Sequence, residues 1–143
     1  MRICKCLIFL LLSMMVTIAG CSANSDIQIS DIWARPGLAE GNSAVFFVVD
    51  NPSNEDDRIL SASSDIATAV ELHESTLIDD VMKMEKQEFV LIPAGEEVLF
   101  KPGGLHVMLI GLHKDLMVGD EFILTIQLEK NGEIPLDVVV EEP

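Results

Sequence analysis

Histidine and methionine gather in two short stretches of the sequence. The first stretch holds His73 and, further along, Met82 and Met84, and the second is His106-Val107-Met108. If the second stretch is a β-strand, His106 and Met108 point to the same face, because side chains alternate between the two faces of a strand. Met82 and Met84 share a face for the same reason. The two stretches could therefore present imidazole nitrogens and thioether sulfurs to one site.

Imidazole and thioether groups form a soft, neutral set of metal ligands. This set favours Cu(I) over Mg²⁺, Ca²⁺ or Zn²⁺, which prefer carboxylates, carbonyls or more nitrogen ligands. A thioether also stays unprotonated at any working pH. Two His and two Met would form a tetrahedral site whose ligands carry no formal charge.

Each of these residues also has a purely structural interpretation. A Met in a β domain usually fills space in the core, and a lone His on a strand is more often a surface or hydrogen-bonded residue. His113 lies in a polar turn and is expected to be solvated, while Met117 is expected in a loop or in the core. On residue types alone, the His and Met residues of the two stretches could either bind a metal ion or have a structural role.

The elements that must position these residues are short alternating segments broken by turn residues. This pattern predicts a single-domain, antiparallel all-β fold, a Greek-key sandwich or barrel. The last hairpin is the clearest, because Asn131-Gly132 suits a type I′ turn. Trp33 is expected to anchor the core, and Gly103-Gly104 to form the turn before His106. The ten predicted strands are Ile27–Ala34, Ala44–Asp50, Arg58–Ser63, Ala69–Glu74, Val81–Lys86, Phe89–Ile92, Glu97–Phe100, His106–Ile110, Glu121–Leu128 and Ile134–Val140.

Composition excludes several classes of function. The 143 residues include 24 acidic and 9 basic side chains, which give a net charge of −15. Nucleic acids and anionic lipid surfaces are bound mainly by Lys and Arg, so neither is an expected partner. A hydrophobic fraction of 49% is enough to build a core. The sequence contains no recognisable nucleophile, paired acid/base carboxylates or phosphate-binding loop, and we expect no enzymatic activity.

The first twenty residues have the features of an export signal. Two positive charges precede an apolar run from Leu7 to Ala19, and Ile18-Ala19-Gly20-Cys21 resembles the lipobox of bacterial lipoproteins. We therefore expect residues 1–20 to be a signal peptide, 21–26 a lipidated Cys21 and tether, and 27–143 the folded domain. An uncleaved anchor or an ordinary signal peptide is the alternative. The folded domain would then have no free thiol, which excludes thiolate catalysis and Cys-ligated zinc or blue copper.

The spacing of the candidate ligands resembles one known family. His73, Met84, His106 and Met108 follow the His-x10-Met-x21-His-x-Met pattern of the PCu(A)C family of bacterial periplasmic copper chaperones. The surrounding sequence is similar over most of residues 27–141. The matching segments are Ile32-Trp33-Ala34-Arg35-Pro36, Val70-Glu71-Leu72-His73-Glu74, Val81-Met82-Lys83-Met84, Ile92-Pro93-Ala94-Gly95, Lys101-Pro102-Gly103-Gly104-Leu105-His106-Val107-Met108-Leu109 and Gly119-Asp120.

The resemblance implies a cupredoxin-like fold that binds one Cu(I) per chain through His73, Met84, His106 and Met108. It further implies delivery of copper towards the binuclear copper centre of cytochrome c oxidase, to an oxidase subunit or a Sco-type thiol protein. Met82 is a candidate auxiliary ligand. Ser75 stands where many relatives have Met, and the chain lacks the His- and Met-rich tail that some relatives use for Cu(II).

The expectation from the sequence is an exported copper(I) chaperone, attached to the bacterial cell envelope only through its lipid. Two alternatives remain at this point. The same site could buffer or scavenge copper without a dedicated acceptor. The chain could instead be a structural β-sandwich lipoprotein that binds no metal.

Overall fold

The computed structural model describes residues 26–142, and ten strands run through them. Each strand overlaps one of the ten predicted segments, which confirms the all-β prediction. The predicted signal peptide and the predicted lipidation at Cys21 lie outside the described residues. Within residues 26–142 no helix is long and apolar enough to span a membrane. The strands are β1 (Gln28–Ala34), β2 (Asn42–Asp50), β3 (Asp57–Ser63), β4 (Ala67–Ile78), β5 (Val81–Lys86), β6 (Val90–Ile92), β7 (Glu97–Phe100), β8 (Leu105–Leu112), β9 (Glu121–Leu128) and β10 (Gly132–Val140).

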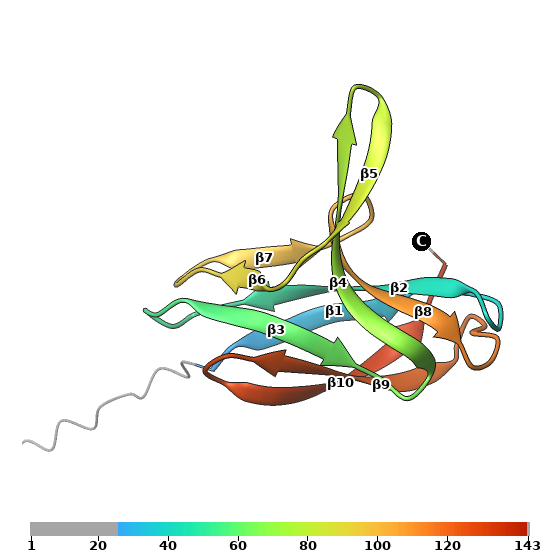
Figure 1. Ribbon diagram of the computed structural model, residues 1–143. Coiled ribbons are helices and arrows are strands. Elements are labelled where there is room, and N and C mark those ends of the chain that lie inside the picture. Colours follow the sequence, from blue (N-terminus) through green and yellow to red (C-terminus); the bar gives the residue numbers. More distant parts are fainter. Residues whose placement is uncertain (1–25, 143) are drawn as a thin grey trace, which may run out of the picture.

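All ten strands belong to one sheet, in the order β5-β4-β8-β7-β2-β1-β10-β9-β3-β6, with an additional pairing of β8 with β2. Neighbours pair antiparallel except for β1 with β10 and β7 with β8, which are parallel. β3 and β4 also contact each other although they are far apart in strand order, so the sheet folds over on itself around the core (Figure 1). The first and last strands lie side by side.

The core follows the alternation of the strands. On β9, Phe122, Leu124, Ile126 and Leu128 are buried while the residues between them are more exposed. Burying a side chain of this size contributes roughly 1.5–3 kcal/mol, which is why strict alternation determines the register of the sheet. The most completely buried large side chains are Phe47, Ile59, Ile92, Leu109, Leu112, Leu116, Leu124, Ile126 and Leu128.

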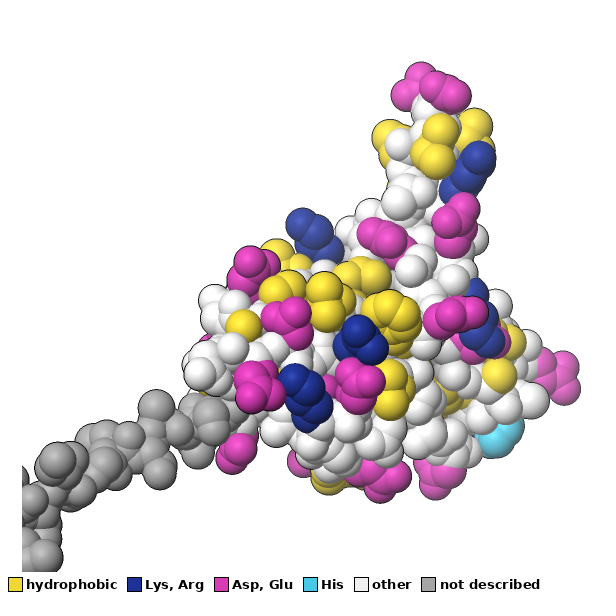
Figure 2. All heavy atoms as spheres, turned by 60° about the vertical axis from the view of Figure 1, so that its left-hand side comes forward, with side chains coloured by type: hydrophobic (Ala, Val, Ile, Leu, Met, Phe, Trp, Pro, Cys, Tyr) yellow, Lys and Arg dark blue, Asp and Glu magenta, His cyan; other side chains and the backbone are white. Residues whose placement is uncertain are grey.

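β4 is longer than the predicted segment Ala69–Glu74. It continues to Ile78 and forms with β5 a hairpin that projects from the body of the molecule (Figure 1). Asp79 and Asp80 form its tip, both with positive φ. Hydrophobic side chains lie exposed beneath this acidic tip, among them Leu77 and Val81 (Figure 2). The sequence pattern could not predict this exposure, because the hairpin extends beyond the core that would otherwise cover them.

Trp33 was expected to anchor the core, but it lies outside the main core. It is half-buried on β1, and its ring lies 4.7 Å from the ring of Phe46 on β2. The backbone register explains this position, because Trp33 pairs with Phe46 directly across the two strands and so shares its face. This face is the one opposite the core.

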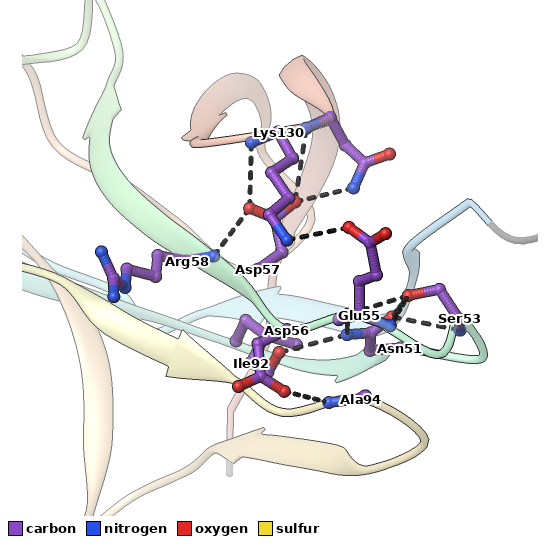
Figure 3. A network of polar contacts seen from close by, with 10 residues as sticks. Asn51, Ser53, Glu55, Asp56, Asp57, Arg58, Ile92, Ala94 and Lys130 are labelled. Carbon is purple, nitrogen blue, oxygen red and sulfur yellow. Dashed lines mark hydrogen bonds and ion pairs between the residues drawn. The ribbon is translucent and has the colours of Figure 1, made fainter.

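A network of polar contacts stabilises the end of the sheet that contains β9, β3 and β6 (Figure 3). The buried carboxylate of Asp57 accepts hydrogen bonds from the backbone N–H groups of Arg58, Lys130 and Asn131, and from the Asn131 side chain at 2.7 Å. The buried side chain of Asn51 donates to the carbonyl oxygens of Glu55 and Ile92. These contacts connect the loop before β3 to the β9–β10 turn and to the end of β6.

Candidate metal centre

Antiparallel pairing brings the predicted ligands to one face of the sheet. β4 pairs with β8 so that His73 lies opposite His106, and their ring centroids are 5.9 Å apart. Met108 follows two residues after His106 on β8 and therefore points to the same face. β5 pairs with β4 so that Met84 lies opposite Ser75, two residues beyond His73. All four predicted residues thus share a face, although they come from three strands.

A pocket of about 230 Å³ opens on this face. Three of the four predicted ligands line it, and His73 lies beside it next to His106. Met82 is exposed on β5 opposite Leu77 and is not among the lining residues. The full lining consists of Arg35, Pro36, Asn42, Ser43, Ala44, Phe46, Ser75, Met84, Pro102, Gly103, His106 and Met108.

The imidazole of His106 is held in one orientation by the turn that precedes β8. Its Nδ1 lies 3.0 Å from the carbonyl oxygen of Gly104. A carbonyl can only accept, so Nδ1 carries the hydrogen and the lone pair is on Nε2. Gly103 has a φ of 80°, a conformation that favours glycine and shapes this turn, as the sequence analysis expected.

The environment also favours the neutral form of His106. The side chain is buried, and this burial is the main cause that lowers its pKa below the ordinary value of 6.5. The hydrogen bond to Gly104 opposes this effect, the nearby His73 and the charge of Arg35 add smaller lowering effects, and the net shift of the pKa is downward. A neutral imidazole has a lone pair available for a metal ion.

His73 is oriented by a carboxylate rather than by a backbone carbonyl. Its Nε2 lies 2.9 Å from Glu71 Oε2, so the Nε2–H group donates and Nδ1 carries the lone pair. Lys86 Nζ donates to the other oxygen of Glu71 at 2.6 Å. The hydrogen bonds from His73 and Lys86 lower the pKa of Glu71.

The other ring nitrogen of His73, Nδ1, is in an unusual environment for a polar atom. Among the side chains of residues 26–142, His73 Nδ1 is the buried nitrogen or oxygen atom that lacks a hydrogen-bond partner. Leaving a buried polar atom unpaired costs about 1–3 kcal/mol, so such an atom calls for an explanation such as a bound ion. A metal ion that accepts this lone pair would remove the cost.

No role was predicted from the sequence for Glu71, Lys86 or Arg35. Glu71 lies two residues before His73 on the same strand face, so alternation alone could have indicated that the two side chains meet. Lys86 is opposite His73 on β5, a relation that depends on the pairing register. The guanidinium group of Arg35 lies over the Phe46 ring, 5.3 Å from its centroid, and depends on the fold in the same way.

The donor set fits a soft, monovalent ion better than a hard one. Within residues 26–142, no group of three or more His, Cys, Asp or Glu side chains is arranged to hold a metal ion. Met84, His106 and Met108 instead line one pocket, with His73 opposite His106, so the candidate donors are two imidazoles and two thioethers. These neutral ligands suit Cu(I).

Comparison with known proteins identifies the family. A family model described as "Putative lipoprotein LpqE-like" matches residues 27–140, and the chain belongs to this family. Uncharacterized protein RP573 of Rickettsia prowazekii (strain Madrid E) is 32% identical over 123 residues, which cover 82% of this chain and 68% of the relative. A protein of Leifsonia xyli subsp. xyli (strain CTCB07) named "Putative lipoprotein Lxx21020" is 29% identical over 117 residues, with coverages of 81% and 70%.

Solved structures show the same fold and confirm the resemblance to the PCu(A)C family. The copper-bound PCuAC domain from PmoF2 is 29% identical, with a TM-score of 0.68 over 82% of this chain and 93% of that domain. The Cu(I) form of DR1885 from Deinococcus radiodurans is 22% identical, with a TM-score of 0.64 and coverages of 85% and 83%. The cupredoxin-like, all-β class predicted from the sequence is therefore correct.

Proposed function

We propose that this protein is a copper(I) chaperone of the bacterial cell envelope. It binds one Cu(I) per chain through His73, Met84, His106 and Met108, and it passes the ion to an acceptor protein. Because it takes up and releases the ion without changing it, it is not an enzyme.

One structural observation gives the strongest support for this metal site. His73 and His106 lie opposite each other on β4 and β8, and each has one ring nitrogen hydrogen-bonded and the other free. Ligating histidines in metalloproteins are oriented in this way, with the second N–H donated to a carboxylate or a carbonyl. The copper-bound PCuAC domain of PmoF2, 29% identical in sequence, supports copper as the ion.

The geometry of the ligands supports uptake and release rather than permanent storage. His106 is buried, whereas Met84 is 51% exposed on the edge strand β5. A ligand on an exposed edge strand can leave the ion first and make room for a donor from the acceptor. The remaining ligands then exchange in turn, and copper stays Cu(I) throughout.

The family supports a place in the cell envelope. The chain belongs to a family described as lipoproteins, and we propose attachment through lipid on Cys21 as the only contact with the membrane. We further propose delivery towards the binuclear copper centre of cytochrome c oxidase, to an oxidase subunit or a Sco-type protein.

An anaerobic titration tests the site. The purified protein would compete for Cu(I) with a chromogenic chelator, beside a His106→Ala, Met108→Ala double variant and a Met117→Ala control. We expect one equivalent to be bound tightly by the parent and the control, and binding to be lost in the double variant. If the folded parent did not bind Cu(I), the proposal would be wrong, and a structural lipoprotein that binds no metal would be the remaining interpretation.

Oxidase assembly in a deletion strain tests delivery. A chaperone predicts a loss of oxidase activity that added copper restores, together with normal copper tolerance. A protein that only buffers copper predicts normal oxidase activity and altered copper tolerance.

A further inference from the structure

The pocket beside the two histidines carries a positive charge that is not neutralised locally. The ion pairs that Lys and Arg side chains form within residues 26–142 are Arg58–Glu129, Lys86–Glu71 and Lys130–Glu55, and Arg35 takes part in none of them. Arg35 nevertheless lines the pocket, with its guanidinium group over Phe46. Arg35 is the only Lys, Arg, Asp or Glu among the lining residues of this pocket, although the chain as a whole has a net charge of −15.

Further polar groups line the same pocket. Ser75 and Asn42 line it together with His106, and the Asn42 side-chain oxygen accepts a hydrogen bond from the Gly111 N–H. Arg35 itself is fixed at its backbone, because its carbonyl oxygen accepts a hydrogen bond of 2.6 Å from Ser43 and its N–H donates to Ala44. The pocket thus combines a positioned cation and hydrogen-bonding groups with three of the proposed copper ligands.

These neutral ligands do not require a cation beside them. A guanidinium group next to a Cu(I) site opposes binding of the ion by Coulomb repulsion, so Arg35 does not serve to hold copper. Its charge would instead favour an anion that enters the pocket. The anion that competes best for Cu(I) against thioethers is a thiolate, which is soft and also charged.

We propose that this pocket is the entry site for an anionic sulfur ligand, a thiolate, that takes copper from the site. The inference rests on the proposed function and specifies the chemistry of the acceptor. The thiol loses its proton to water, and the thiolate sulfur forms a bond to Cu(I) as the bond from Met84 Sδ breaks. The bonds from Met108 and the two imidazoles then break in turn as further donors of the acceptor bind the ion. No electron is transferred, and the negative charge of the thiolate offsets the positive charge of the Cu(I) that leaves.

Two variants with the same change of charge test this inference. Arg35→Gln removes the pocket cation, and Arg58→Gln removes an exposed cation on β3, far from β5 in strand order. The Cu(I)-loaded protein would be mixed with 2-mercaptoethanesulfonate, an anionic thiol, or with a neutral trithioether chelator. Copper transfer would be followed by stopped-flow absorbance.

We expect Arg35→Gln to slow transfer to the anionic thiol by about three- to tenfold at low ionic strength. The difference should shrink above about 0.15 M salt, where charges beyond about 8 Å are screened. Arg58→Gln should leave the rate unchanged. Transfer to the neutral chelator should be unchanged in both variants, and Arg35→Gln should not weaken Cu(I) binding.

Two outcomes would overturn the inference. Equal rates for Arg35→Gln and Arg58→Gln with the anionic thiol would show that the pocket cation has no part in transfer. An equal loss with the neutral chelator would show that Arg35 supports the structure of the site instead.

A copper-free measurement separates this inference from the proposed function. Thiocyanate, a soft anion, would be titrated into the apoprotein and followed by the backbone amide resonances of Ser75, Met84 and His106. We expect saturable shifts in the parent that are lost in Arg35→Gln. Saturable thiocyanate shifts in a protein that fails to bind Cu(I) would contradict the copper function but support the anion site. The absence of saturable shifts in the parent would overturn the anion site.

Discussion

The two histidines of the proposed site leave different ring nitrogens without a hydrogen bond. His106 donates from Nδ1 to a backbone carbonyl, whereas His73 donates from Nε2 to a carboxylate that Lys86 also holds. The carbonyl belongs to the main chain and is present whatever the side chain at position 104. The orientation of His73 depends on Glu71, and it is therefore the part of the site most sensitive to substitution.

Removal of Glu71 should weaken copper binding without unfolding the protein. We expect Glu71→Ala to lower the affinity for Cu(I) about 10- to 100-fold, because loss of such a hydrogen-bond partner frees the ring and its tautomer. Glu71→Gln keeps an acceptor and should lose less. Competition titration measures the affinity, and the ¹⁵N shifts of the His73 ring report the tautomer. Unchanged tautomer and affinity in Glu71→Ala would contradict this role.

The protonation of His106 should occur at lower pH than that of an ordinary histidine. Burial, His73 and Arg35 together lower its pKa below 6.5, so the neutral form persists as the pH falls. We expect the His106 ring resonance of the apoprotein to titrate with a midpoint below 6.5. An unfolded chain takes up this proton first, so the contribution to stability declines as the pH falls below 6.5. A midpoint above 6.5 would be inconsistent with the burial described here.

At the scale of the elements, the exposed edge strand β5 is less tightly packed than the interior strands of the sheet. The projecting hairpin has an edge strand, β5, whose residues are all exposed. Strands β2 and β8 lie inside the sheet and carry fully buried side chains such as Val45 and Leu109. Stability within a protein varies with such local packing.

Hydrogen exchange should follow this difference. We expect the amides of β5 to exchange fastest among the strands and those of β2 and β8 to exchange slowest, because opening of β5 exposes little apolar surface. Amide exchange followed by mass spectrometry measures this order. Protection of β5 equal to that of β8 would show that the hairpin is covered in solution.

The Asp57 network should hold the opposite end of the sheet at neutral pH. Burial alone would raise the pKa of Asp57, but the hydrogen bonds from Asn131, Arg58 and Lys130 together lower it below the ordinary value of 3.8. This contribution to stability is present above pH 3.8 and is lost as the pH falls through the lowered pKa. We expect Asp57→Ala to cost about 2–4 kcal/mol at pH 7, because several donors lose their acceptor.

Urea unfolding measures this cost, with the exposed Asp137→Ala as the control. The difference between Asp57→Ala and the parent should narrow below pH 3.8, whereas the control should match the parent throughout. A constant difference across this range of pH would contradict the role given to the ionised carboxylate.

At the scale of the whole molecule, the excess of acidic residues opposes folding through self-repulsion. Figure 2 shows acidic side chains spread over the visible face and at the tip of the hairpin. With a net charge of −15, added salt should screen this repulsion and stabilise the folded state. We expect the Tm of the apoprotein to rise between about 0.01 and 0.5 M NaCl. A Tm that falls with salt would show that attractive ion pairs dominate instead.

The strands could be predicted from the sequence because alternation and turn residues are local signals. Leu72 and Val107 are buried as the alternation predicts, and the turn at Gly103 has the expected conformation. The neighbours of each strand could not be predicted in this way, because pairing joins residues that are far apart in the chain. Trp33 was wrongly placed in the core for this reason.

The site could be predicted only in part for the same reason. The types and spacing of the proposed ligands can be read from the sequence, and the shared face of His106 and Met108 follows from alternation. The contacts of Lys86 with Glu71 and of Arg35 with Phe46 depend on strand register and packing, so they became visible only in the fold. The direction of each imidazole lone pair also depends on such contacts.

The parallel pairing of β1 with β10 has a consequence for how the chain reaches its folded state. Trp33 and Ala34 find their partners, Val139 and Val140, more than a hundred residues later. The two halves of the sheet therefore cannot join until almost the whole chain is available, and closing so long a loop slows folding. A nascent chain that lacks β10 leaves the strands on both sides of it with bare edges, the usual starting point of aggregation. Pairing of β10 with β1 and β9 is then the step that completes the sheet.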